Sequence, residues 1–237
     1  MIDIQNLTKE FNGISALNIP HLAIGNGEAV GIVGNNGAGK TTLFKSILDL
    51  LKPDSGSVSI EGIDVNFSAD WQNHLNAFID ESFLIEFLKP KEYLSFVLKM
   101  KRSRVDVEEL LSRHQEFSNQ DIDQSTKYIR DLSTGTKVRI GVLSLLAGDP
   151  KYLLLDEPFA HLDPTSQAKL RKLIREQKEK GRSVIVSSHN LQNIRESCDR
   201  VILLEKGELK FDVAVDDANM ERLATYFDTW AGISPSM

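Results

Sequence analysis

The sequence predicts an α/β fold in which a largely parallel sheet is interrupted by a helical insertion. Short apolar runs of strand character alternate with amphipathic helical patterns along most of the chain. Two of those runs lack a polar alternate face, which is typical of central parallel strands that are covered on both sides. A long stretch in the middle of the chain has helical patterns only. We therefore expect two lobes of different composition.

Six apolar runs are predicted to be strands, at residues 2–4, 29–33, 58–60, 152–155, 184–186 and 201–204. Between them, residues 43–51 place their apolar side chains on one helical face just after a glycine-rich turn. Residues 168–174 do the same before Gly181. Strands and helices thus alternate, which sets the fold class.

The helical insertion is predicted to span about residues 83–148, with helices over residues 84–100, 105–117 and 137–147. The α/β lobe then comprises about residues 1–82 and 149–211. A short C-terminal tail at residues 212–237 carries no clear signal, and we expect fraying over 229–237. Because repeats, low-complexity tracts and long linkers are absent, residues 1–237 are expected to form a single domain.

Composition and charge restrict the class of protein. Of 237 residues, 41% are hydrophobic and 26% charged, which is typical of a soluble globular domain. Acidic residues outnumber basic ones, 34 to 28, which argues against a nucleic-acid partner. No apolar run approaches the length of a membrane span and no secretory leader is apparent, so a cytoplasmic protein is expected. The single cysteine, Cys198, fits a reducing compartment and is expected to be a small buried residue.

Residues 34–41, Gly-Asn-Asn-Gly-Ala-Gly-Lys-Thr, match G-x-x-x-x-G-K-[ST] between a predicted strand and a predicted helix. Glycines let successive N–H groups point at phosphate oxygens, and the helix N-terminus adds positive potential. We expect Lys40 to reach the β- and γ-phosphates and Thr41 to bind Mg²⁺. The alternative is a turn that only caps a helix. The residues expected to contact ATP here are Asn35, Asn36, Gly37, Ala38, Gly39, Lys40, Thr41 and Thr42.

Two acids, Asp156 and Glu157, follow the apolar strand at residues 152–155. The carboxyl end of that strand lies at the same sheet edge as the phosphate loop, so both carboxylates are expected beside it. We expect Asp156 to hold Mg²⁺ and Glu157 to orient and deprotonate the attacking water. A pair of acids in a solvated turn is the plain alternative.

A third segment, Leu132-Ser133-Thr134-Gly135-Thr136, resembles the LSGGQ signature of the ABC ATPase family. Thr134 and Thr136 depart from that pattern. In the family this segment contacts the γ-phosphate held by the opposite subunit, so the resemblance implies a dimer in which Ser133, Gly135 and Thr136 bind the partner's ATP. By itself the segment is equally readable as a helix N-cap.

Further landmarks of the family follow in order from about residue 7 to residue 211. Phe11 occupies the position of the aromatic residue that stacks on adenine, although an isolated Phe is more often a core residue. Residues 160–163 resemble the loop that crosses the dimer interface, with Asp163 near the nucleotide; the alternative is an ordinary turn. His189 is similar to the switch histidine that contacts the γ-phosphate, whereas a lone His at a strand end is usually structural.

One departure concerns the entry to the helical lobe, where the family commonly has a glutamine and this chain has Glu81. A carboxylate there can reach Mg²⁺ or water, but its negative charge near the phosphates can slow or retune hydrolysis. The alternatives are a solvated surface acid at Glu81 and a metal ligand at the neighbouring Asp80.

The resemblance implies a RecA-like P-loop NTPase core with an N-terminal antiparallel β portion and an inserted helical lobe. It further implies MgATP-driven pairing of two subunits, with a homodimer as the expected form. The pair would drive separate transmembrane permease subunits from the inner face of the membrane. The short C-terminus and the signature variant look most like the ABC-2-type exporter subfamily. Rival readings are a soluble ABC ATPase of an assembly machine and a weakly hydrolysing, ATP-gated regulator. The cargo and its direction stay open.

Overall fold

A computed structural model of the chain describes residues 1–118 and 120–230. Its larger sheet, within these residues, has the strand order β10-β9-β3-β8-β7-β6. Neighbouring strands pair in parallel from β9 through β6, while β10 is antiparallel to β9. The strands are β3 (Ala29–Val33), β6 (Leu75–Phe78), β7 (Tyr152–Leu155), β8 (Ser183–Ser188), β9 (Arg200–Glu205) and β10 (Glu208–Ala214).

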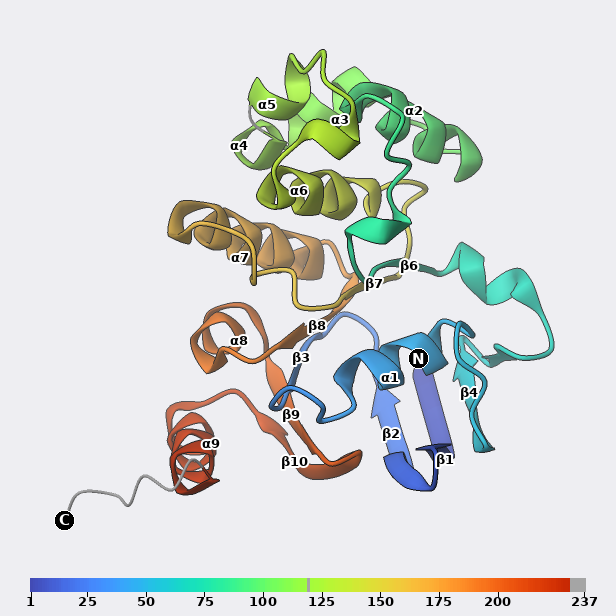
Figure 1. Ribbon diagram of the computed structural model, residues 1–237, viewed down its shortest axis with the longest axis vertical. Helices are drawn as coiled ribbons and strands as arrows, with labels where there is room; N and C mark the ends of the chain where they lie inside the picture. Colours follow the sequence, from blue (N-terminus) through green and yellow to red (C-terminus); the bar gives the residue numbers. More distant parts are fainter. Residues whose placement is uncertain (119, 231–237) are drawn as a thin grey trace.

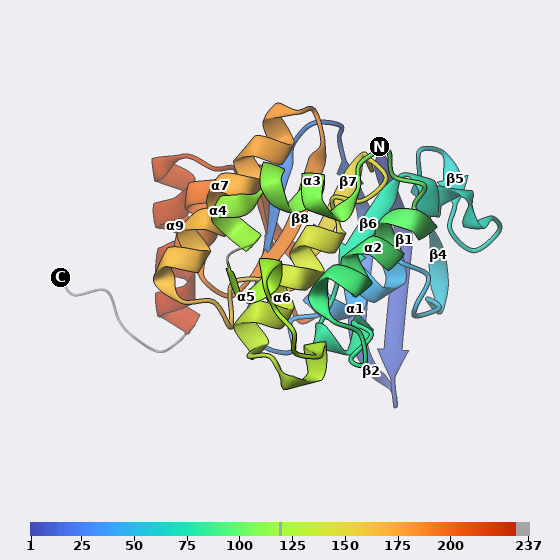
Figure 2. The ribbon, with the colours of Figure 1, turned by 90° about the horizontal axis from the view of Figure 1, so that it is seen from above.

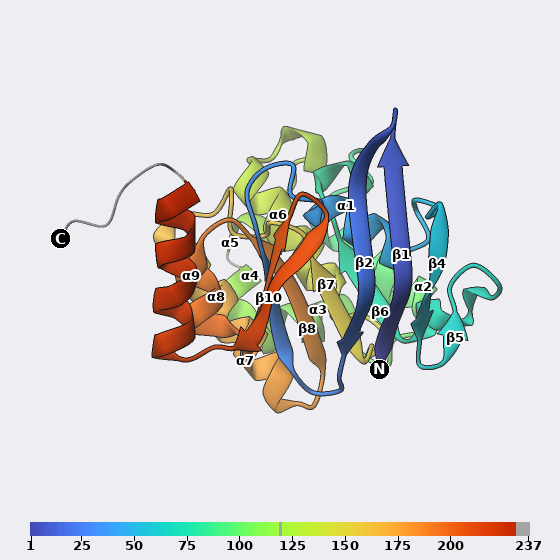
Figure 3. The same ribbon diagram turned by 90° about the horizontal axis from the view of Figure 1, so that it is seen from below.

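A smaller antiparallel sheet of order β2-β1-β4-β5 lies beside the larger one (Figure 3). The hairpin between its two long strands turns at Asn12 and Gly13, whose φ angles of 52° and 77° suit a two-residue turn of this sequence. The strands are β1 (Ile2–Phe11), β2 (Ile14–Ile24), β4 (Ser55–Ile60) and β5 (Ile63–Asp64).

The helical lobe sits above the sheets, with α7 between it and the strands (Figure 1, and from above in Figure 2). Its elements between β6 and β7 are η2 (Glu81–Phe83), α2 (Pro90–Met100), α3 (Val107–Arg113), α4 (Gln115–Ser118), α5 (Gln120–Asp123), η3 (Ile129–Asp131) and α6 (Thr134–Ser144). The remaining helices are α1 (Lys40–Ile47), η1 (Ala69–Asn73), α7 (Pro164–Glu179), α8 (Leu191–Ser197) and α9 (Asp217–Trp230).

The larger sheet separates two hydrophobic cores. Alternate residues of β7 supply both, because Leu153 and Leu155 pack toward the helical lobe while Tyr152 and Leu154 pack toward the antiparallel sheet. All four are at most 2% exposed. A strand covered on both faces has no polar side, which is the physical reason that its sequence is continuously apolar.

The α/β class is confirmed, and each predicted strand lies within an observed one. The helix expected from residue 84 begins instead at Pro90, whose ring favours the first helical turn. The helix expected over 105–117 is divided into α3 and α4, since His114 ends the first. The helix expected over 137–147 begins at Thr134 and ends at Ser144.

The C-terminal tail, for which the sequence carried no clear signal, contains a strand and a helix. Residues 212–214 complete β10, and residues 217–230 form α9, which packs through the buried side chains of Met220 and Leu223. The fraying expected at 229–237 falls mostly on residues 231–237, outside the described part of the chain. Strands β2, β5, β6 and β10 were also not anticipated.

Candidate functional site

The phosphate loop connects β3 to α1 at the carboxyl edge of the sheet. Gly39 immediately precedes the helix with φ of 106°, and a Cβ there would lie 2.7 Å from Ala16 O, so both conformation and space require glycine. Lys40 is buried and folded back along the loop. Its Nζ donates to Gly34 O at 2.7 Å and to Asn35 O at 3.3 Å. The cation is therefore held at the mouth of the loop.

Thr41 and Asp156 meet across the edge of the sheet. The Thr41 hydroxyl donates to Asp156 Oδ2 at 2.6 Å, and Ser187 Oγ donates to the other carboxylate oxygen. Burial raises the pKa of Asp156, while the hydrogen bonds from Ser187 and Thr41 oppose that rise. Ser187 was not assigned from the sequence, although a pair of hydroxyl residues directly after the apolar run at 184–186 was a usable signal.

Glu157 connects the phosphate loop to β8. Its Oε1 lies 3.2 Å from Lys40 Nζ, and its Oε2 lies 2.9 Å from His189 Nδ1. The Glu157 N–H donates to Ser187 Oγ at 2.7 Å. Glu157 has φ of 45°, a conformation that non-glycine residues adopt at a cost and that is concentrated at functional sites. Two side chains expected to be catalytic, Glu157 and His189, are thus in direct contact.

The donor set at Thr41 and Asp156 suits Mg²⁺. The ion prefers hard oxygen ligands and in nucleotide sites takes one or two from protein, with phosphates and water completing its shell. A hydroxyl and a carboxylate already converge to 2.6 Å here. In the described residues no cluster of three His, Cys, Asp or Glu side chains offers a metal cage. Such a cage is not needed when nucleotide oxygens supply the other ligands.

Glu81 lies near this edge without joining it. Strand β6 ends beside Asp156, whose N–H donates to Phe78 O at 2.9 Å, and Glu81 begins η2 three residues later. Among the described residues, no hydrogen bond connects Glu81 to Thr41 or Asp156. Asp80 is engaged otherwise, because its Oδ1 accepts from Ser82 N at 2.8 Å as the cap of η2.

Phe11 ends β1 with its side chain 47% exposed, and Lys9 Nζ lies 5.6 Å from the centre of its ring. One ring is thus available at the surface for a planar partner. Asn36 and Gly37 are also exposed at the tip of the phosphate loop, and Asn35 and Thr42 are half-buried.

The signature segment lies at the start of α6 in the helical lobe. Ser133 caps this helix, since its Oγ accepts from Thr136 N at 3.3 Å and lies 2.9 Å from Thr136 Oγ1. Gly135 packs against the following loop, where a Cβ would lie 2.9 Å from His161 O. Within the described residues, no hydrogen bond links Ser133 to the phosphate loop of the same chain. Figure 1 shows α6 in the lobe away from α1.

Asp163 caps α7, with Oδ1 accepting from Ser166 N at 3.0 Å. Arg139 on α6 lies 3.7 Å from Asp163 Oδ2 and also donates to Ser166 Oγ. This carboxylate therefore fixes the helix that follows it and connects the signature helix to the loop at residues 160–163.

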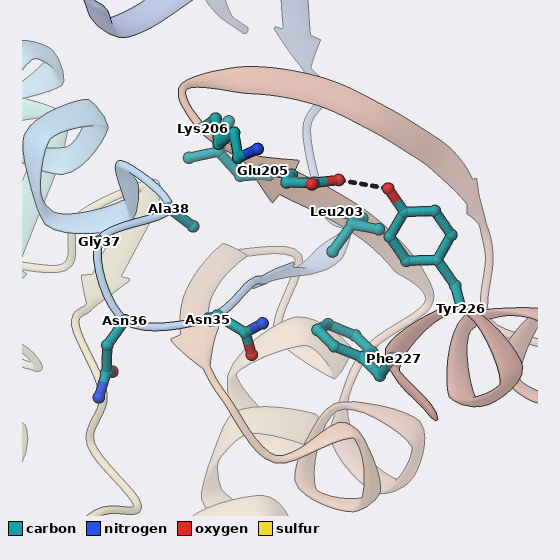
Figure 4. Close-up of a pocket in the computed structure, with 10 residues that line it drawn as sticks. Asn35, Asn36, Gly37, Ala38, Leu203, Glu205, Lys206, Tyr226 and Phe227 are labelled. Atoms are coloured by element: carbon teal, nitrogen blue, oxygen red, sulfur yellow. Dashed lines mark hydrogen bonds between the residues drawn. The ribbon is translucent and has the colours of Figure 1, made fainter. Parts of the chain in front are cut away.

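The back of the phosphate loop is braced by an element that sequence reasoning missed. Gly207 N, in the turn between β9 and β10, donates to Ala38 O at 2.9 Å. Tyr226 on α9 donates to Glu205 at the end of β9, and Phe227 faces Asn35 across a small pocket (Figure 4). The turn between β9 and β10 therefore holds the back of the loop, and α9 contacts the end of β9 and borders the pocket beside the loop.

A glycine-rich loop between strand and helix, with a buried lysine, a threonine–aspartate pair and a following glutamate, defines a P-loop nucleoside triphosphatase. The family model described as ABC transporter matches residues 17–160. The chain belongs to the ABC transporter family and is one of its ATP-binding, ATP-hydrolysing subunits.

Relatives and solved structures agree. The lipopolysaccharide export system ATP-binding protein LptB of Haemophilus influenzae is 28% identical, with 88% of each chain covered. The sulfate/thiosulfate import ATP-binding protein CysA of Bradyrhizobium diazoefficiens is 32% identical over 88% of this chain and 62% of its own. The cassette MJ0796, solved as a post-hydrolysis dimer with ADP and Pi, is 27% identical, with a TM-score of 0.80 over 91% of this chain and 99% of that one.

Among the described residues, no helix combines the length and apolar character needed to cross a membrane.

Proposed function

We propose that two copies of this chain close head to tail on two MgATP molecules and drive separate permease subunits. In this reading Thr41 and Asp156 hold Mg²⁺, which neutralises phosphate charge, and Lys40 binds the terminal phosphates. Glu157 orients and deprotonates water, and His189 holds Glu157 and contacts the γ-phosphate. The contact of Glu157 with both Lys40 and His189 is the observation that carries this assignment.

Pairing is supported by where Ser133 lies. The segment is on the helical lobe, away from the phosphate loop of its own chain, so it can act only on a nucleotide held elsewhere. Gly135 and the buried Thr136 lie in the first turn of this helix, and a helix N-terminus attracts phosphate. Asp163 and Phe11 would complete the nucleotide site at the interface and at the base, respectively.

An exposed apolar patch supplies the surface for a permease. Phe83, Ile85 and Phe87 are 51%, 38% and 68% exposed immediately after Glu81. Arg130 stacks on Phe87 at 5.5 Å, and Arg130 N donates to Glu86 O at 3.1 Å. Residues 83–87 are thus connected at one end to Glu81 and at the other to the signature segment. A partner that presses on the patch would move both elements of the site.

Copurification tests this reading. A tagged chain from detergent-solubilised membranes should bring down a multi-span protein, and Phe87→Asp should abolish that recovery while leaving ATP binding intact. Phe67→Asp is the matched control, because Phe67 is 88% exposed but lies outside the patch. Equal recovery with the two variants would refute docking at residues 83–87, and no recovery with the parent would favour a soluble assembly-machine ATPase.

We further propose that this chain lies on the inner face of the membrane and drives export through a permease of the ABC-2 type. The export role in the name of LptB supports it, while the import role of CysA weighs against it. A regulator that binds ATP but barely hydrolyses it is the second candidate, since Glu81 and Thr136 both depart from the family pattern. Its discriminating measurement is the ATPase rate with permease present.

A further inference from the structure

A cavity of about 550 Å³ opens at the edge of the sheet opposite the nucleotide, beside the starts of β7 and β8. The loop after α2 forms one side, the end of α3 the second, and the residues before β7 and β8 the third. Four arginines line it together with one acid: Arg102, Arg104, Arg113, Arg182 and Asp149. The chain as a whole has a net charge of −6, so this local excess of positive charge is opposite in sign to that of the protein.

The arginines are incompletely neutralised. Among the described residues, Arg102 and Arg104 have no ion-pair or hydrogen-bond partner for their side chains. Arg113 forms an exposed ion pair with Glu109. Arg182 is 16% exposed; its Nη1 donates to Gln177 Oε1 at 2.7 Å, and its Nη2 pairs with Asp149, whose side chain is 89% exposed. Each of these two ion pairs has an exposed carboxylate, so a ligand can compete for the guanidinium groups.

The loop that carries Arg102 and Arg104 has a defined conformation, held by a backbone hydrogen bond. Arg102 has φ of 49°, and Ser103 N donates to Leu98 O at 2.9 Å. Across the cavity, Gly148 has φ of 74°, and a Cβ there would lie 2.8 Å from Lys101 Cβ. The two sides are therefore held at close quarters by a glycine that no other residue replaces without strain.

His114, next to Arg113 in the chain, is affected by the same positive charges in addition to burial. Burial, followed by the charges of Lys180, Arg182 and Arg113, lowers the pKa of His114 to about 4. His114 is therefore neutral at physiological pH and adds no charge of its own.

We propose that this cavity is a binding site for a small, compact anion that carries two or three negative charges. The guanidinium fork matches phosphate and carboxylate groups through paired N–H donors, and four forks around one acid call for a polyanion rather than a chloride. Because the cavity lies across the sheet from Asp156, bound anion and ATP occupy separate sites. The strands β7 and β8 connect them, since each begins at the cavity and ends at the catalytic edge.

Calorimetric titration tests the site with two probes, pyrophosphate and tricarballylate. Saturating ADP occupies the phosphate loop throughout, so that its own affinity for phosphates does not contribute. We expect saturable binding of at least one probe, and weakening by about tenfold or more in the double variant Arg102→Gln/Arg104→Gln. The matched control Lys52→Gln/Lys127→Gln removes two exposed cations outside the cavity and should bind as the parent does.

The two probes distinguish two kinds of ligand. Binding of pyrophosphate alone would assign a phosphate compound to the site, and binding of tricarballylate alone would assign a polycarboxylate. Raising the salt concentration should weaken either. Three results would overturn the site: no saturable binding to the parent, equal binding to the parent and the arginine variant, or release of ADP in proportion to the probe bound. Unchanged ADP affinity verifies that each variant is folded.

Discussion

Replacing Glu157 with Gln isolates the proposed base. Gln keeps the shape of the side chain and can still bond to His189, but it cannot accept a proton from water. Lys40 keeps its hydrogen bonds to Gly34 O and Asn35 O when Glu157 loses its charge, so the cation is not left without partners. The fold should therefore survive, and a large loss of rate belongs to the reaction.

The expected loss in rate is on the order of 10² to 10⁴-fold, the usual contribution of a general base. That range corresponds to about 3 to 5 kcal/mol of transition-state stabilisation. ATP should still bind, because Gln removes a negative charge from beside the γ-phosphate. Closure of two subunits on ATP should be strengthened for the same reason.

Two measurements check this. Steady-state phosphate release gives the rate, and size-exclusion chromatography with and without MgATP gives the oligomeric state, in which the variant should accumulate as a dimer. Glu176→Gln, which removes a partly exposed carboxylate from α7, is the control and should behave as the parent. Hydrolysis at the parental rate by Glu157→Gln would refute the assignment. An inactive variant that stays monomeric with ATP would support Glu157 as the base but would contradict pairing of two copies of this chain.

Three further outcomes are expected. Lys40→Ala should lose tight nucleotide binding in a fluorescent-ATP titration, since the loop keeps its N–H groups but loses its buried cation; affinity equal to the parent would contradict the phosphate-loop assignment. Glu81→Gln should leave ATP affinity unchanged and alter the hydrolysis rate, whereas an unchanged rate with and without permease would return Glu81 to a surface acid. Tyr226→Phe should raise KM for ATP severalfold at similar kcat, because it frees Glu205 from α9; an unchanged KM would show that α9 does not brace the loop.

Local sequence was sufficient for features that depend on neighbours in the chain. Residues 34–41 carry their own turn chemistry, and the strand at 152–155 carries burial on both faces. Because both segments follow the carboxyl end of a predicted strand, Asp156 was expected beside the phosphate loop, and it lies 2.6 Å from the Thr41 hydroxyl. The ends of helices were harder to predict from the sequence. Periodicity alone would continue the helix at residues 105–117 through His114, where the structure ends α3.

What the sequence determined about this protein is the list of groups that can bind and hydrolyse a nucleotide, because glycines, a lysine and acids at fixed spacing have few other uses. Only the tertiary structure shows which other residues contact and support these groups. Ser187 joins Asp156 to Glu157 only because β8 lies beside β7, and Tyr226 reaches Glu205 at the end of β9 only because α9 folds back toward that strand. The four arginines of the cavity likewise come from segments up to 80 residues apart, between Arg102 and Arg182, and no local pattern brings them together.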